Sequence, residues 1–518
     1  MIYRSPFPDV EIPVVSLPAY LFEHANQWAD KPALIDGPTN RTLTYGQLTT
    51  AVKRTATGLA ARGFSKGDVF AIYSPNIPEY AIAFFGVASA GGVNTTINPT
   101  YTSKELRHQL LDSGATYLVT IPQFLEAARE AITDTGVKEI FVFGEAEGAT
   151  PFAELMIAGE PPQIEIDPKE DLVALPYSSG TTGLSKGVML THYNIVANLS
   201  QILGVEATAE TEILMGILPF YHIYGMTAIM CNTLRAGASV VTMPRFELEQ
   251  FLDLIQKHKI TTAYLVPPLV LALAKHPVVD RYDLSTLDDI MSGAAPLPES
   301  VATTCATRNN VVVRQAYGLT ETSPATHINP KSREIKVASV GTALPNTEFR
   351  IVDLSTLKDA VQGDLGEVWI RGPQVMKGYL NNPSATEDMI DNDNWLHSGD
   401  IGKADDDGYL YVVDRVKELI KYKGLQVAPA ELEGIIQSHP AVADVAVIPS
   451  PDEEAGEIPK AFVVVKPDVP LTADEVIAYV AERVSPQKKV RKVEFIDAIP
   501  KVPSGKILRR QLVERERQ

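Results

Sequence analysis

One segment of the chain reads Tyr177-Ser178-Ser179-Gly180-Thr181-Thr182-Gly183-Leu184-Ser185-Lys186-Gly187. Its glycines let the backbone turn N–H groups toward a bound anion, because no Cβ stands in the way. Its hydroxyls add hydrogen-bond donors, and its lysine adds a mobile positive charge. In a Walker A loop, glycine directly precedes the lysine and Ser or Thr directly follows it, which is not the order here. The segment predicts a different kind of polyphosphate-binding loop, although its composition alone is equally typical of a flexible surface loop.

Four further motifs follow this segment in the chain. They read Gln315-Ala316-Tyr317-Gly318-Leu319-Thr320-Glu321-Thr322, Trp395-Leu396-His397-Ser398-Gly399-Asp400, Lys417-Glu418-Leu419-Ile420-Lys421-Tyr422-Lys423-Gly424-Leu425-Gln426 and Pro503-Ser504-Gly505-Lys506. In this order the motifs resemble the acyl-adenylate-forming enzymes, a superfamily of acyl-CoA ligases, luciferases and peptide-synthetase adenylation domains. In its details the pattern resembles the 4-coumarate–CoA ligases of bacteria and plants most. Ser185 is a departure, because proline is commoner there in the superfamily.

The resemblance implies that ATP is a substrate and that the first segment is its phosphate loop. The residues that take this role by resemblance are Ser178, Ser179, Gly180, Thr181, Thr182, Gly183 and Lys186.

Length and composition limit the classes of protein to consider. The 518 residues exceed what one hydrophobic core usually organises, so two or more domains are expected. The formal net charge of −18 argues against a nucleic-acid partner, which needs a basic footprint, but a local basic site can still bind ATP and CoA. The chain has two cysteines, Cys231 and Cys305, and no apolar signal core near Met1. We therefore expect a cytoplasmic protein. The sequence leaves open whether it is a monomer or a homodimer.

Residues 213–234 carry no formal charge and are long enough to span a bilayer. They contain Gly216, Pro219, His222 and Asn232, which suit a buried strand–turn–helix segment better. We therefore expect no integral membrane association.

Strand-like and helix-like patterns alternate along the chain. Residues 69–73 and 262–266 are typical of buried strands, and residues 80–90 are typical of a helix. The alternation predicts an α/β fold, with a large N-terminal domain (residues 1–414) of mixed, largely parallel β-sheets flanked by helices. Residues 415–518 are expected to form a small, mobile C-terminal α+β domain, with a polar hinge at residues 415–417.

The motif that begins at Gln315 combines a ring, a glycine, a hydroxyl and a carboxylate at the end of a predicted strand. Tyr317 can stack on adenine, Thr320 can bind a phosphate, and Glu321 can bind Mg²⁺, a hard cation that prefers oxygen ligands. By itself the motif is more typical of a strand-end turn with a core tyrosine. The resemblance adds Gln315, Ala316 and Gly318 to the nucleotide-binding residues.

Asp400 lies in the segment that resembles the ribose-binding segment of the superfamily. One carboxylate can accept hydrogen bonds from two vicinal hydroxyls, and Arg415 resembles a second contact to the ribose and phosphate. An aspartate beside a glycine more commonly caps a turn.

The predicted small domain carries two lysines that the resemblance assigns to different steps. Lys506 would stabilise the charge that develops during adenylation, whereas Lys421 and Gln426 would serve thioester formation. Lysines on a solvated strand or a terminal loop are more often plain surface residues. Because the two lysines should not occupy one site together, the resemblance implies rotation of the small domain about Lys417. Lys423 and Gly424 are the expected CoA-binding residues.

The acyl pocket is predicted mainly from the segment around His222 and Tyr224, which resembles the lining of the carboxylate tunnel. Without that match, a lone histidine in an apolar stretch is more often a satisfied core residue. Small residues after a predicted strand leave room beside the adenine, although close helix–strand packing explains them equally well. The expected pocket residues are His222, Tyr224, Gly293, Ala294, Gly318, Ser323 and Pro324.

The resemblance therefore predicts an ATP-dependent carboxylic acid–CoA ligase that works through acyl-AMP and releases pyrophosphate, then AMP. The cofactors and co-substrates would be ATP, Mg²⁺ and CoA, and the acid 4-coumarate or a related hydroxycinnamate. A medium- or long-chain fatty acyl-CoA ligase is the alternative. A luciferase-like monooxygenase, a nucleotide-binding module and a carrier-loading domain fit the sequence less well.

Overall fold

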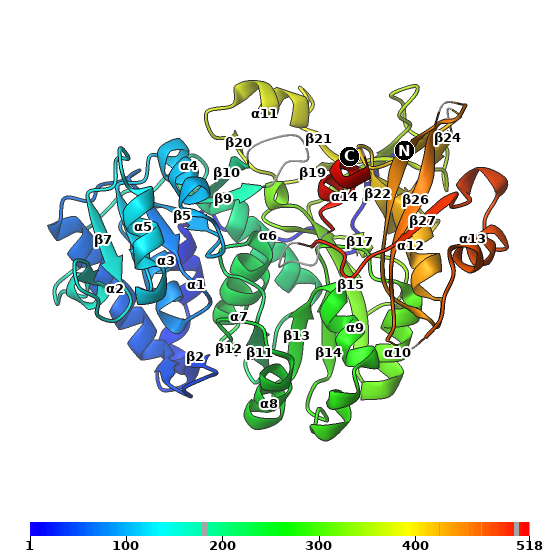
Figure 1. The fold of residues 1–518 in the computed structure, drawn as a ribbon. Coiled ribbons are helices and arrows are strands. Elements are labelled where there is room, and N and C mark those ends of the chain that lie inside the picture. Colours follow the sequence, from blue (N-terminus) through cyan, green and yellow to red (C-terminus); the bar gives the residue numbers. More distant parts are fainter. Residues whose placement is uncertain (179–184, 424, 453, 468, 502–506, 517–518) are drawn as a thin grey trace.

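The computed structural model describes residues 1–178, 185–423, 425–452, 454–467, 469–501 and 507–516. Two sheets form the large domain, and a small unit at the C-terminal end lies beside the larger of them (Figure 1). The smaller sheet of the large domain has a parallel centre, with antiparallel strands at one edge. Its order is β20 (Gly378–Tyr379), β10 (Lys186–Thr191), β9 (Leu172–Ser178), β5 (Val93–Ile97), β4 (Val69–Tyr73), β6 (Tyr117–Thr120), β7 (Glu139–Val142) and β8 (Thr150–Pro151).

The larger sheet changes from antiparallel to parallel in its middle, at β15. Its antiparallel part runs through β1 (Tyr3–Arg4), β18 (Glu348–Val352), β19 (Gly366–Arg371), β21 (Leu396–Ala404), β22 (Tyr409–Arg415), β17 (Gly341–Ala343) and β16 (Ala325–Ile328). Its parallel part runs through β15 (Val312–Gly318), β14 (Asp289–Ser292), β13 (Thr262–Leu265), β11 (Ile213–Gly216), β12 (Ser239–Thr242) and β2 (Pro32–Asp36), and β3 (Thr42–Thr44) adds an antiparallel edge. The predicted mixed α/β class is confirmed, although the antiparallel share exceeds the expectation, because short hairpins join the strands after β15.

Helices cover both sheets of the large domain. They are α1 (Leu17–Phe22), α2 (Tyr45–Ala61), α3 (Pro78–Ser89), α4 (Ser103–Ser113), α5 (Leu125–Ala131), α6 (His192–Val205), α7 (Asn232–Arg235), α8 (Leu248–His258), α9 (Pro267–Lys275), α10 (Glu299–Asn309) and α11 (Pro383–Met389). Short 3₁₀ turns are η1 (Ala25–Trp28), η2 (Pro122–Phe124), η3 (Phe152–Leu155), η5 (Pro277–Arg281), η6 (Thr320–Thr322) and η7 (Pro486–Lys488), whereas η4 (Tyr224–Cys231) is a π-helix.

One hydrophobic core joins the two large sheets. It includes Phe70 of β4, Phe84 of α3 and Val240 of β12, all fully buried. The uncharged residues 213–234 form β11, a turn, η4 and α7 inside this domain, as predicted. In the described part of the chain, no helix combines the length and the apolar character needed to cross a membrane.

The small unit has its own sheet and its own core. The sheet consists of β24 (Leu425–Val427), β23 (Ile420–Tyr422), β26 (Gly456–Val465), β25 (Val442–Asp452) and β27 (Lys492–Phe495), and the helices are α12 (Pro429–Gln437), α13 (Ala473–Ala481) and α14 (Arg509–Glu516). Its core packs Ile420, Leu432, Val447 and Val463 together. Strand β22 leads directly from the larger sheet into this unit.

Candidate active site

A hairpin of β9 and β10 flanks the predicted phosphate loop. Ser178 pairs with Lys186 across the two strands, so both ends of the loop are held at neighbouring positions. The predictions for Ser179, Gly180, Thr181, Thr182 and Gly183 fall outside the described residues. The ammonium group of Lys186 lies 4.6 Å from the ring centre of Tyr379, a cation–π contact that keeps it beside β20.

Tyr379 links this hairpin to the Gln315 motif. Its hydroxyl donates a hydrogen bond of 2.7 Å to Oε1 of Glu321, whose residue is only 5% exposed. Burial, and then the charge of Glu321, raise the pKa of Tyr379, so the phenol keeps its proton. The oxygens of this buried carboxylate suit Mg²⁺, which prefers oxygen ligands. No local pattern in the sequence predicts this role for Tyr379, because its partner Glu321 lies 58 residues away along the chain.

The predicted ribose contacts meet at one point. Strands β21 and β22 place Asp400 opposite Arg415, and the Arg415 Nε lies 3.1 Å from Oδ1 of Asp400. The hydroxyl of Tyr317 donates to Oδ2 of the same carboxylate at 2.6 Å. The carboxylate of Asp400 is therefore fixed in position by two side chains from different strands. Glu321 lies in η6 just after β15, the strand that carries Tyr317, so the predicted metal ligand and one of the residues that position Asp400 lie on adjoining elements.

Gln315 has partners within the protein. Its Oε1 accepts a 3.1 Å hydrogen bond from the N–H of Leu297, and its Nε2 donates to the Val337 carbonyl at 2.7 Å. The first contact holds the loop after β14, which includes Gly293 and Ala294, against β15, and the second holds the segment between β16 and β17. A direct contact between Gln315 and the nucleotide stays a prediction.

Gly318 stands where the chain reverses between β15 and β16. A Cβ there would lie 2.0 Å from the carbonyl oxygen of Pro324, so a side chain cannot fit. Ser323, at positive φ, donates from its hydroxyl to the Gln374 carbonyl at 2.9 Å. The turn thus brings Gly318, Ser323 and Pro324 together, and Thr320 begins η6 within it. That these residues line an acyl pocket stays a prediction.

Tyr224 and Gly293 also lie together. A Cβ at Gly293 would lie 3.0 Å from the Tyr224 ring, so this glycine lets the ring approach the end of β14. The Tyr224 hydroxyl donates to the Met291 carbonyl at 3.1 Å, and its ring stacks on Tyr264 with 6.2 Å between ring centres. His222 accepts a hydrogen bond from the Tyr224 N–H at its Nδ1, with 3.2 Å between the nitrogens.

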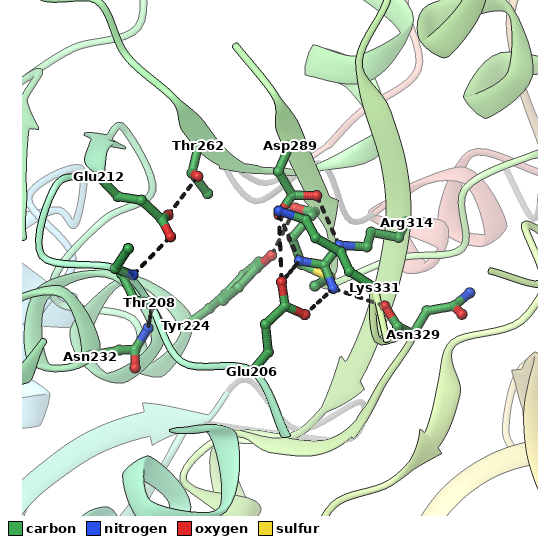
Figure 2. A network of polar contacts seen from close by, with 12 residues as sticks. Glu206, Thr208, Glu212, Tyr224, Asn232, Thr262, Asp289, Arg314, Asn329 and Lys331 are labelled. Carbon is green, nitrogen blue, oxygen red and sulfur yellow. Dashed lines mark hydrogen bonds and ion pairs between the residues drawn. The ribbon is translucent and has the colours of Figure 1, made fainter. Parts of the chain in front are cut away.

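A cluster of charged side chains around the buried Arg314 lies beside Tyr224 (Figure 2). Arg314 of β15 donates to both oxygens of Asp289 (2.8 and 2.7 Å), to both oxygens of Glu206 (2.5 and 2.7 Å) and to the Asn329 carbonyl (3.0 Å). These contacts use all five N–H donors of a guanidinium group. Lys331 approaches Asp289 at 3.4 Å. We did not single out this cluster from the sequence, although an arginine inside an apolar strand should have indicated a buried partner.

The small-domain residues stand apart from this site. The Lys421 N–H donates to Glu457 at 2.7 Å, and the Lys421 backbone pairs with that of Gln426 in the β23–β24 hairpin. Lys423 forms an ion pair with Glu454. In Figure 1 this hairpin lies at the outer edge of the small domain, far from β9 and β10. Gly424 and Lys506 fall outside the described residues, so their predictions carry no geometry.

Among the residues whose placement is described, no group of three His, Cys, Asp or Glu side chains is arranged to hold a metal ion. The prediction that Glu321 binds Mg²⁺ therefore requires further oxygen ligands, which a bound nucleotide would supply.

The chain is similar to known proteins along nearly its whole length. A family model described as AMP-binding enzyme matches residues 21–380, and one described as AMP-binding enzyme C-terminal domain matches residues 431–506. The chain is 42% identical to 4-coumarate–CoA ligase 2 of Petroselinum crispum, over 99% of this chain and 96% of the relative. ATP-bound MatB from Rhodopseudomonas palustris is 28% identical, with a TM-score of 0.89, over 96% of this chain and 98% of that chain. The anthranilate CoA ligase AuaEII, solved with anthranoyl-AMP, is 26% identical, with a TM-score of 0.90, over 98% of each chain.

Proposed function

The chain belongs to the AMP-binding enzyme family, and we propose that it is an ATP-dependent carboxylic acid–CoA ligase acting on 4-coumarate or a related hydroxycinnamic acid. The observation that carries the proposal is the meeting of Tyr317, Asp400 and Arg415 beside Glu321. This group offers a ring for adenine, acceptors for ribose hydroxyls, a cation for phosphate and a carboxylate for a metal ion.

In the first step, the carboxylate of the acid attacks the α-phosphate of ATP, the bond to the β-phosphate breaks, and acyl-AMP and pyrophosphate form. Both reacting groups are anionic, so a lysine that bridges them lowers the barrier. The proposal gives this role to Lys506, on its position in the motif. Lys186 neutralises the outer phosphates, and Asp400 orients the ribose. Mg²⁺, when bound near Glu321, reduces the charge on the phosphates.

In the second step, the CoA thiolate attacks the acyl carbon, AMP leaves and the thioester forms. The proposal places Lys421 and Gln426 near this reaction, with Lys423 and Gly424 along the CoA arm. Because the β23–β24 hairpin lies far from β9 and β10 in Figure 1, residues 415–518 have to turn about Lys417 between the steps. We assign the present arrangement to the first step. A cytoplasmic setting is proposed from the unpaired, buried Cys231 and Cys305.

The preference for an aromatic acid rests on Tyr224 and Gly293. The Tyr224 ring is held by Met291 and Tyr264, so it presents a fixed surface to a substrate ring, a contact worth about 0.5–1.5 kcal/mol beyond area burial. His222 lies at the mouth of the proposed pocket. Because apolar pockets discriminate weakly between acids of similar size, we expect a broad preference among aromatic acids.

The test measures pyrophosphate release and acyl-CoA formation with 4-coumarate, cinnamate, benzoate, hexanoate and decanoate. We expect the highest kcat/KM for 4-coumarate, and AMP release that depends on CoA. A higher kcat/KM for decanoate would replace this proposal with the fatty-acid alternative. Oxygen uptake and light in the absence of CoA would favour a luciferase-like reaction instead.

A matched pair of glycine variants localises the acyl pocket. Gly293→Val pushes a side chain into the Tyr224 ring, so kcat/KM for 4-coumarate should fall more than that for hexanoate. Gly434→Ala is the control, because a Cβ at Gly434 meets nothing within 4 Å and the residue lies on a small-domain helix. Equal losses for both acids in Gly293→Val would place the pocket elsewhere.

A further inference from the structure

Helix α12 has no capping group of its own. Its N-cap residue is Ala428, whose side chain cannot accept a hydrogen bond, and Pro429 has no N–H. The first free donor is the N–H of Ala430, and it donates to Oδ2 of Asp414 at 2.8 Å. Asp414 lies on β22, before the proposed hinge at Lys417, whereas α12 lies after it. The cap of α12 therefore comes from the other side of the hinge.

The neighbouring charges belong to the small domain. Arg509 of α14 bonds Glu433 of α12 at 2.7 Å and forms an ion pair with Glu418. Arg509 and Glu433 are the charged groups of these helices that face Asp414, and Arg415, the next residue on its own strand, turns its side chain to Asp400. Since Glu418, Glu433 and Arg509 all follow the hinge, they travel together. The contact between Asp414 and Ala430 crosses the hinge.

We propose that Asp414 is a positioning residue that holds the small domain in its present orientation through the N-terminus of α12 and releases it when the domain turns. The inference rests on the proposed two-step reaction and its domain rotation. A rotation about Lys417 carries Ala430 away from Asp414, so this hydrogen bond has to break between the steps.

The buried charge of Asp414 makes the present orientation of the small domain easy to leave. Asp414 is 6% exposed, and its burial raises the pKa of its carboxyl group from 3.8 to about 6, against the opposing effect of Arg509. At neutral pH the cost of keeping this charge out of water therefore works against the present orientation, although the Ala430 and Arg415 N–H groups favour the charged form. Rotation returns the carboxylate to water, where the charge is stable. A change of about two in the pKa of Asp414 corresponds to up to about a 100-fold change in the equilibrium between the two orientations.

Two variants of Asp414 test the inference by opposite effects. Asp414→Asn keeps an acceptor for Ala430 but removes the buried charge, so the present orientation should become more stable. We expect transfer from preformed 4-coumaroyl-AMP to CoA to slow about 10–100-fold, with single-turnover pyrophosphate release within about twofold of wild type. Asp414→Ala removes the acceptor, so pyrophosphate release should slow more than transfer to CoA.

The pH dependence gives a second readout. For each protein we compare the rate of transfer to CoA with the rate of pyrophosphate release. In wild type this ratio should fall as the pH drops from 7.5 to 5.5, because Asp414 takes up a proton in the present orientation. In Asp414→Asn the ratio should change less. Asp405→Asn is the matched control, because Asp405 also accepts backbone and lysine hydrogen bonds beside β22 but lies away from the hinge. It should keep the wild-type ratio and pH dependence.

The outcomes separate the two proposals. In one outcome the wild-type protein runs both half-reactions, while Asp414→Asn and Asp414→Ala each lower the two rates in equal proportion. That result would overturn the role of Asp414 and leave the proposed function intact. A wild-type protein that releases no pyrophosphate with any acid would overturn the proposed function and this inference together.

Discussion

Arg314 in the large domain and Arg509 in the small domain are both buried between carboxylates, but their surroundings differ. Arg314 spends all five N–H donors on groups of one domain, and Lys331 brings the formal charge of the cluster with Asp289 and Glu206 to zero. Arg509 faces Glu433, Glu418 and Asp414, so that cluster carries an excess of negative charge. The first arrangement fixes strands in place. The second leaves one carboxylate, Asp414, incompletely compensated at a joint.

The largest expected effect comes from breaking the balanced cluster. Arg314→Met leaves Asp289 and Glu206 without their partner, although the methionine replaces much of the lost volume. Removing one member of a buried ion pair typically costs about 3–5 kcal/mol, so we expect a loss of this size in the free energy of unfolding. Urea denaturation followed by tryptophan fluorescence measures it. A loss below 1 kcal/mol would mean that the cluster does not support the sheet.

The next effect tests whether the movable domain supplies chemistry that the fixed domain lacks. Lys506→Ala should lower the rate of pyrophosphate release about 10²–10³-fold, because a group that stabilises transition-state charge is lost. Transfer from preformed acyl-AMP to CoA should persist. Lys421→Ala is the counterpart and should slow transfer more than pyrophosphate release. Normal pyrophosphate release in Lys506→Ala would contradict the assignment.

Arg509→Met should be less costly than Arg314→Met, and its cost should depend on pH. Burial raises the pKa of Asp414 to about 6 and also raises that of Glu433. Between their usual values and these raised values, the folded protein binds protons that the unfolded chain has released, so stability falls as pH rises.

Without Arg509 these carboxylates can take up protons and limit the damage. We expect a loss of about 1–3 kcal/mol at pH 7.5 and a smaller loss at pH 5.5, from urea denaturation at both values. An equal loss at the two pH values would mean that the carboxylates near Arg509 are not poised to take up protons.

The smallest effect concerns the exposed member of the balanced cluster. Lys331 has a side chain that is 42% exposed and lies 3.4 Å from Asp289. Exposed ion pairs contribute little, so Lys331→Gln should lower the free energy of unfolding by less than about 1 kcal/mol. A loss as large as that of Arg314→Met would show that neutrality, and not the saturated guanidinium, stabilises the cluster.

Local signals in the sequence predicted much of the fold. The helix predicted at residues 80–90 is α3 (Pro78–Ser89), and the strands predicted at residues 69–73 and 262–266 are β4 and β13. The strands of the parallel part were readable because they are short, apolar and separated by helical patterns.

Contacts between segments that lie far apart along the chain could not be predicted from the sequence. Arg314 and Glu206 are 108 residues apart, and no periodic pattern connects them. Tyr379 belongs to a two-residue strand that has no signal of its own. The motif residues Tyr317, Asp400 and Arg415 were found through the resemblance, and the meeting of their side chains follows from strand pairing that only the fold supplies.

Strand β22 has one further consequence. Its last two residues turn to opposite sides, Arg415 to the Asp400 carboxylate and Asp414 to the first turn of α12. A change in the contact of Arg415 with Asp400 therefore affects the contact of Asp414 with α12, and the reverse also holds. Thermodynamic linkage makes such coupling reciprocal: if an orientation of the small domain alters the affinity for ATP by some factor, ATP alters the population of that orientation by the same factor. Nucleotide affinity, measured without any acid or CoA, is thus a direct gauge of how firmly α12 is held.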